Sequence, residues 1–181
     1  SPISRCLLAP HTRTALTYRG FKMLRFSTGL KCQIWNSVRG AVDPVQSLEH
    51  GVIYVFTGAQ PASADAAAMG TLLGKITVNG GAFTHGVATN GLDFKASTNG
   101  VLYKEPAEVW QLLGEAAGTA GWFRHCGNAE DTLGVSTTLP RIDGRISLPD
   151  GGGEMWLSSL AIAVGALSGV DRYEIAWPAG F

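Results

Sequence analysis

The clearest pattern along the chain is a series of short apolar runs separated by turn signals. Residues 52–56 form a continuous apolar, β-branched and aromatic run, which is typical of a strand buried on both faces. Asn-Gly and Asp-Gly pairs, which favour hairpin turns, lie at positions 79–80, 90–91, 99–100 and 143–144. The further predicted strands are 72–78, 92–97, 101–105, 119–125, 141–147, 154–157 with its continuation 161–164, and 173–177.

About eight short strands at this spacing predict an all-β domain over residues 51–181, either an antiparallel β-sandwich or a jelly roll. Strands do not alternate with long helical patterns, which argues against a Rossmann or TIM-barrel architecture. The predicted core consists of bulky apolar residues within the strand-like runs, namely Ile53, Val55, Leu73, Ile76, Trp122, Ile146 and Ile175.

Residues 23–50 show a different pattern, in which apolar residues recur at a loosely helical spacing. Gly29, Gly40 and Pro44 interrupt this spacing, so we expect an N-terminal arm with one or two short helices. Asp43 followed by Pro44 fits the start of a helix.

The first twenty-two residues differ from the rest in charge, because they carry four basic residues and no acidic one. The remainder has ten basic and fourteen acidic residues. We interpret residues 1–22 as lying outside the domain, as a leader or read-through upstream of a start at Met23. A basic arm that binds a partner and a processed leader are the alternatives.

Composition narrows the class of protein further. Hydrophobic residues make up 45% and charged residues 15%, and the 24 glycines indicate a folded, turn-rich chain. Fourteen basic residues balance fourteen acidic ones without a basic cluster, which argues against a nucleic-acid surface. An apolar run of about 18 residues, as a membrane span requires, is absent from the sequence.

Candidate chemistry is sparse. The three cysteines, Cys6, Cys32 and Cys126, are odd in number and widely spaced, so we expect free thiols. Motifs for a serine nucleophile, a zinc-binding helix, a phosphate loop and a dinucleotide site are absent from the sequence. His125 and Cys126 precede Glu130 and Asp131, which leaves open a nucleophile or a metal site, but a partly buried histidine at a strand end is the simpler interpretation. We therefore predict a protein that is not an enzyme and has no cofactor or metal.

Five tryptophans suggest either a carbohydrate platform or a packed core; they are Trp35, Trp110, Trp122, Trp156 and Trp177. Three of them, Trp122, Trp156 and Trp177, lie in strand-like runs, where large aromatic side chains fill a core or a subunit interface. Trp110 lies in the loop-like segment 106–110. We therefore predict that Trp110 is partly exposed and available to a partner.

Several segments together resemble small virion structural proteins of tailed bacteriophages, of the group that decorates or cements the head. The segments are LRFSTGL (24–30), GVIYVFTGAQPASADAAAMGTLL (51–73), GTAGWFRHCG (118–127), RIDGRIS (141–147) and EMWLSSLAIAVGA (154–166). The likeness extends over residues 23–177 and leaves residues 1–22 outside it.

This resemblance implies an assembly function. Such a protein would bind the major capsid protein on the outside of the virion, as a homotrimer, and stiffen the shell after assembly in the bacterial cytoplasm. Leu24, Phe26 and Leu30 could contact a neighbouring subunit or could pack on their own domain. The alternatives are a tail, collar or fibre-base component, a carbohydrate- or receptor-binding jelly roll, and a small hydrolase that uses His125 and Cys126.

Overall fold

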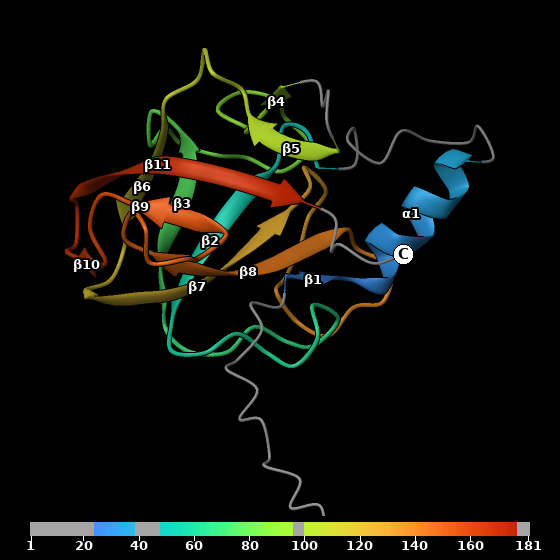
Figure 1. Cartoon of the computed structure of the whole chain (residues 1–181), viewed down its shortest axis with the longest axis horizontal. Coiled ribbons are helices and arrows are strands. Elements are labelled where there is room, and N and C mark those ends of the chain that lie inside the picture. The colour runs from blue at the N-terminus through green and yellow to red at the C-terminus, as the bar shows by residue number, and fades with distance from the viewer. Residues whose placement is uncertain (1–23, 39–47, 96–99, 177–181) are drawn as a thin grey trace, which may run out of the picture.

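The computed structural model describes residues 24–38, 48–95 and 100–176, and this part of the chain is almost entirely β-structure (Figure 1). Its elements are β1 (Arg25–Phe26), α1 (Thr28–Val38), β2 (Val52–Thr57), β3 (Leu72–Val78), β4 (Phe94–Lys95), β5 (Val101–Lys104), β6 (Trp110–Gly114), β7 (Gly118–Cys126), β8 (Arg141–Ser147), β9 (Met155–Leu157), β10 (Ala161–Ile162) and β11 (Leu167–Ala176). The prediction of an all-β fold is confirmed.

Seven of the strands close into a single barrel. Their order is β8, β7, β2, β3, β6, β11 and β9, and β9 returns to β8. All the pairs in this circle are antiparallel except β8 with β9, which is parallel. The predicted sandwich or jelly roll is therefore not confirmed, because the strands close on themselves and the barrel is mixed.

The remaining strands extend the barrel wall. At one end of the order β5 pairs with β11 and β4 with β5, and at the other β1 pairs with β8, while β10 pairs with β7. Figure 1 shows β4 and β5 together beside β11, and α1 on the side of the barrel where β1 lies.

Alternation along the strands gives the barrel an apolar interior. On β2, Ile53 and Val55 belong to the main core, whereas Val52, Tyr54 and Phe56 belong to a second buried cluster. This strand is thus buried on both faces, as its unbroken apolar pattern predicts.

Burial of all seven predicted core residues is confirmed; they are Ile53, Val55, Leu73, Ile76, Trp122, Ile146 and Ile175. Trp122 differs from the others because it lies in the second cluster, where its ring stacks on Phe56 with 4.6 Å between centroids.

The largest error in the strand prediction concerns β6, which is missing from the predicted strands and whose first residue, Trp110, was expected in a loop. Trp110, Leu112 and Gly114 are buried along this strand, and the intervening Leu113 is exposed. Because an apolar residue occupies an outward position, the two-residue alternation is hidden in the sequence. In addition, β11 begins six residues before the predicted position 173, and β4 covers only two residues.

Some predictions fall outside the described residues. These concern residues 1–22 and the start at Met23, the helix start at Asp43 and Pro44, and the residues Cys6 and Trp177.

Candidate functional site

The N-terminal arm is attached to the barrel through a serine that serves two elements. The Ser27 hydroxyl oxygen accepts a hydrogen bond from the Leu30 N–H at 3.1 Å, which caps the first turn of α1. The same oxygen accepts the Arg141 N–H at 2.9 Å, and its hydroxyl donates to the Leu139 carbonyl at 2.7 Å. The start of the helix is therefore bound directly to the strand β8.

Thr28 and Gly29, which follow Ser27, also contact the barrel loops. Asp65 accepts hydrogen bonds from the Thr28 N–H at 2.7 Å and from the Thr28 hydroxyl at 2.6 Å, so the loop before β3 also holds the helix start. A Cβ atom at Gly29 would lie 2.3 Å from the Thr138 carbonyl oxygen, so this position tolerates only glycine without a shift of the backbone.

The predicted arm residues pack on their own barrel. Leu30 is buried in the main core, and Leu24 and Phe26 are partly buried against it. The sequence left open whether these residues contact a neighbouring subunit or their own domain. In the structure they pack on their own domain.

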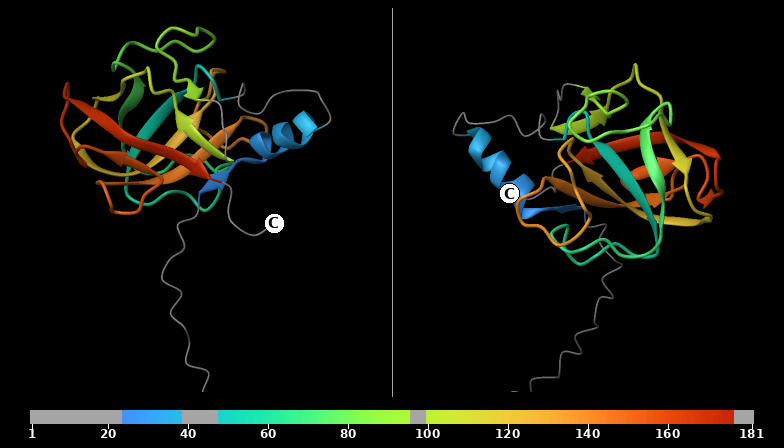
Figure 2. Two further views of the ribbon diagram at one scale, coloured as in Figure 1. Left: turned by 45° about the horizontal axis from the view of Figure 1, so that its top comes forward. Right: turned by 180° about the vertical axis from the view of Figure 1, so that it is seen from behind.

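The outer part of α1 is different, because it projects from one end of the barrel (Figure 2). Trp35 is 71% exposed there, and Lys31 and Cys32 are exposed on the same helix. The helix contains no acidic residue. The arm thus presents a large aromatic side chain and a positive charge to the surroundings, a feature that the sequence analysis did not assign to Trp35.

The prediction for Trp110 is wrong. Its side chain is 1% exposed inside the barrel, and its indole N–H donates to Glu108 Oε2 at 2.7 Å. Neighbouring rings of Phe94 and Tyr173 lie 6.0 Å and 5.3 Å from it, centroid to centroid. Trp110 is a core residue, and it is not available to a partner or a glycan in this structure.

His125 and Cys126 do not form a catalytic pair, because consecutive residues of a strand point to opposite faces. His125 faces the barrel interior, where its Nδ1 lies 2.8 Å from the Tyr173 hydroxyl. Cys126 belongs to the cluster outside the barrel, and its thiol donates to Asp131 at 3.2 Å. The geometry therefore argues against the hydrolase hypothesis.

The environments of the two side chains also suppress their reactivity. Burial lowers the pKa of His125 to about 3, against a smaller opposing effect of the Leu48 carbonyl, so the ring is neutral near pH 7. Burial, together with the negative charge of Asp131, raises the pKa of the Cys126 thiol. A thiol that stays protonated is a poor nucleophile.

Outside the barrel, two arginines are fully buried with carboxylate partners. Arg124 on β7 binds Asp143 on β8 through two hydrogen bonds of 2.7 and 2.8 Å. Arg141 on β8 binds Asp131 in the same two-pronged way, at 2.7 and 2.5 Å. Burial favours the neutral form of Asp131, but the Arg141 hydrogen bonds and the Leu133 N–H hold the pKa of this carboxyl below its ordinary value.

The remaining donors of these arginines hold two loops. Arg124 donates to the Ala66 carbonyl at 2.9 Å, and Arg141 donates to the Gly134 carbonyl at 2.8 Å. The loops between β2 and β3 and between β7 and β8 are thereby fixed over the second cluster. The sequence analysis missed this network, and its role is to organise the fold.

Neither a metal-binding group nor a membrane helix is found in the described residues. Among these residues, there is no group of three or more His, Cys, Asp or Glu side chains that could hold a metal ion. In the same part of the chain, the helix lacks the length and the apolar character needed to cross a bilayer.

Comparison with protein-family models, with curated proteins and with solved structures found no match to this chain.

Proposed function

We propose that this protein is a structural component of a phage virion that binds the outside of the capsid and stabilises the shell. The observation that carries the proposal is the projecting helix α1, which is anchored at its first turn and presents Trp35 at 71% exposure. The resemblance of segments such as residues 24–30 and 51–73 to head-decoration proteins supports the same function.

An exposed tryptophan on a fixed helix is a suitable contact residue for a protein partner. Tryptophan is enriched among the residues that dominate binding energy at interfaces, because it buries a large area with little loss of conformational entropy. The major capsid protein of the same virion is the proposed partner.

Further apolar surface lies on the outer face of the barrel. Leu113 and Leu167 are direct neighbours across β6 and β11 and are both exposed, as is Val164 in the preceding turn. Subunit contacts would cover this area, which supports association into a homotrimer. The opposite orientation of His125 and Cys126 supports an assembly function over a hydrolytic one.

Binding to capsids tests the proposal. Full-length protein is mixed with capsids that lack it and sedimented, and Trp35→Ala is expected to weaken binding by at least about tenfold without changing the melting temperature. Val135→Ala removes an equally exposed apolar side chain from a loop of the barrel and serves as the matched control. Unchanged binding by Trp35→Ala, or no binding by the wild type, would overturn the proposal.

Location and oligomeric state provide independent checks. A density map of the intact particle should place the protein on the head surface, whereas density on the tail, collar or fibre base would assign it to one of those parts. Light scattering at micromolar concentrations should give the mass of a trimer, and a monomer would refute the homotrimer.

A further inference from the structure

A hollow of about 290 Å³ lies on the outer surface of the barrel, where β5 joins β11. Its lining combines two tyrosines with charged side chains of both signs: Lys95, Tyr103, Lys104, Asp171, Arg172 and Glu174, with Pro106 and Tyr173. It lies apart from the chemistry already described, since His125 and Cys126 are not among its lining residues.

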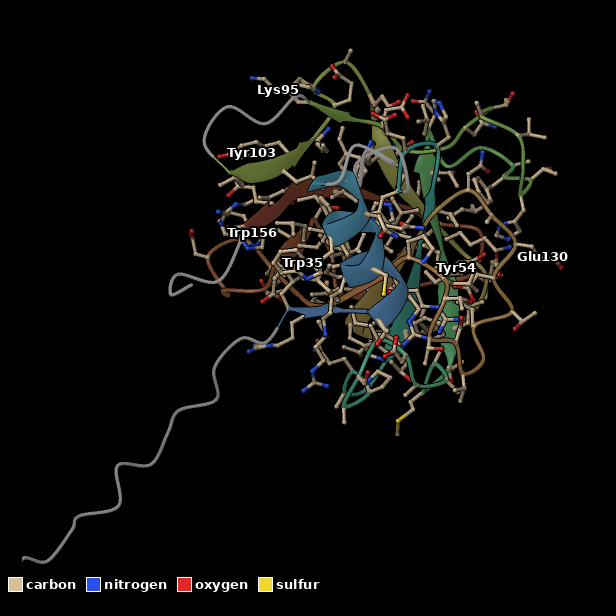
Figure 3. The ribbon with its side chains drawn as sticks, turned by 90° about the vertical axis from the view of Figure 1, so that its right-hand side faces the viewer. Trp35, Tyr54, Lys95, Tyr103, Glu130 and Trp156 are labelled. Atoms are coloured by element: carbon tan, nitrogen blue, oxygen red, sulfur yellow. The ribbon has the colours of Figure 1, made fainter. Side chains whose placement is uncertain are left out.

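The strand register explains why these side chains gather. Tyr103 on β5 stands between Lys95 on β4 and Glu174 on β11, since it is paired with both residues. Arg172, also on β11, is paired with Trp156 on the next strand, β9. The Arg172 guanidinium lies 4.5 Å from the centroid of the Trp156 ring. Figure 3 shows Lys95, Tyr103 and Trp156 one below the other along the same side of the barrel.

A bulge shapes this part of β11. The pairing with β9 shifts between Val170 and Arg172, so Asp171 is the extra residue of the strand. Bulges bend a strand and redirect a side chain, and they are frequent beside binding sites. Here the extra residue lines the hollow.

Three of the charged residues in the lining already have partners. Arg172 pairs with Glu174, and the Lys104 ammonium group donates to the Glu108 carbonyl at 2.9 Å. In the described part of the chain, the side chains of Lys95 and Asp171 have neither a hydrogen bond nor an ion pair. The hollow therefore offers a free donor, a free acceptor and an aromatic ring.

This combination favours a neutral ligand that both donates and accepts hydrogen bonds. A polyanion such as nucleic acid would meet the carboxylates of Asp171 and Glu174, which offset two of the three positive charges in the lining. A sugar has hydroxyl groups for Lys95 and Asp171 and an apolar C–H face for the ring of Tyr103. We propose that the hollow between β5 and β11 binds a neutral oligosaccharide.

Trp156 extends the proposed site in one direction. Strands lie about 4.8 Å apart, so Tyr103 and Trp156, two strands from each other, are separated by about 10 Å across the sheet. The long axis of the oligosaccharide would therefore cross the strands, from Tyr103 over Arg172 toward Trp156.

Titration calorimetry and saturation-transfer NMR with maltohexaose, cellohexaose and chitohexaose test the proposal on the isolated full-length chain. We expect at least one of them to bind with a Kd at or below about 1 mM. Tyr103→Ala should weaken that binding at least about tenfold, whereas Tyr103→Phe, which keeps the ring, should retain most of it. A heparin hexasaccharide is the anionic control.

Asp171→Asn is the second variant. The Asp171 side chain is exposed and has no partner, so this substitution should not affect folding. It should also weaken binding, while Trp35→Ala, outside the hollow, should leave it unchanged. Failure of all three neutral hexaoses to bind, binding of heparin alone, or equal binding by the wild type, Tyr103→Ala and Asp171→Asn would overturn the proposal. Because capsids are absent from this experiment, its outcome is independent of the decoration function.

Discussion

Stability at mildly acidic pH should depend on one buried histidine. His125 is fully buried in the barrel interior, and burial lowers its pKa to about 3. In the unfolded chain the pKa of a histidine is about 6.5. Between these two values the unfolded state binds one more proton than the folded state, so the free energy of unfolding decreases as the pH falls through this window.

The magnitude follows from linkage. Each pH unit within the window costs about 1.4 kcal/mol, and the total between pH 7 and pH 4.5 is about 2.5 kcal/mol. The structure explains why the proton cannot be accepted at lower cost. Nδ1 already contacts the Tyr173 hydroxyl, and although the Leu48 carbonyl favours the protonated ring, the cost of burying the charge outweighs this effect.

Urea unfolding of the wild type and of His125→Gln at several pH values between 7 and 4.5 measures this effect. The glutamine amide can keep a hydrogen bond to Tyr173 but does not titrate. Between pH 7 and pH 4.5, the free energy of unfolding should therefore decrease by about 2.5 kcal/mol less in the variant than in the wild type. Val135→Ala, which shortens an exposed apolar side chain in a loop and removes no titratable group, is the control and should keep the slope of the wild type. Parallel curves for the wild type and His125→Gln would refute the reasoning.

Three further predictions concern the cluster outside the barrel. Trp122→Ala should lower the free energy of unfolding by about 3–5 kcal/mol in urea titrations, because a fully buried indole stacked on another ring is lost; a loss below about 1 kcal/mol would contradict this. Asp131→Asn should cost about 3–5 kcal/mol at pH 7, because it leaves the guanidinium of Arg141 buried without its counter-charge, whereas retained stability in the same assay would show that the pair contributes little. In native protein, a thiol reagent should modify Cys32 at once and Cys126 only as fast as the chain unfolds, as peptide mass spectrometry can measure; equal rates would refute the burial of Cys126.

Local pattern was sufficient to predict most strands. The prediction for residues 141–147 matches β8 in full, and the predicted range 72–78 matches β3. Both segments place β-branched or large apolar side chains at positions that the barrel buries. A strand signal of this kind is contained in a few neighbouring residues and does not depend on the topology.

Closure of the barrel could not be predicted in the same way. It depends on the parallel pairing of Ile146 with Met155 and of Ser147 with Trp156, between two strands joined by a Gly-rich turn. Proximity in sequence and the turn residues favour an antiparallel hairpin there, and no periodic pattern distinguishes the two arrangements.

The buried arginines illustrate a second limit. Arg124 and Arg141 occupy outward positions of strands, where the usual expectation is contact with solvent. Their burial depends on cross-strand register, which places Asp143 opposite Arg124, and on a loop that brings Asp131 to Arg141. The same applies to Trp35, whose exposure depends on how far the helix projects.

The arginine network also has a consequence for evolution. Loops are usually the segments in which insertions and deletions accumulate. Here the carbonyls of Ala66 and Gly134, each in a different loop, are bound by buried guanidinium groups, and an inserted residue near either one would remove an acceptor from a charge that cannot reach water. Homologous chains should therefore conserve the lengths of both loops together with the two Arg–Asp pairs, and should vary instead at the exposed turn around Val164.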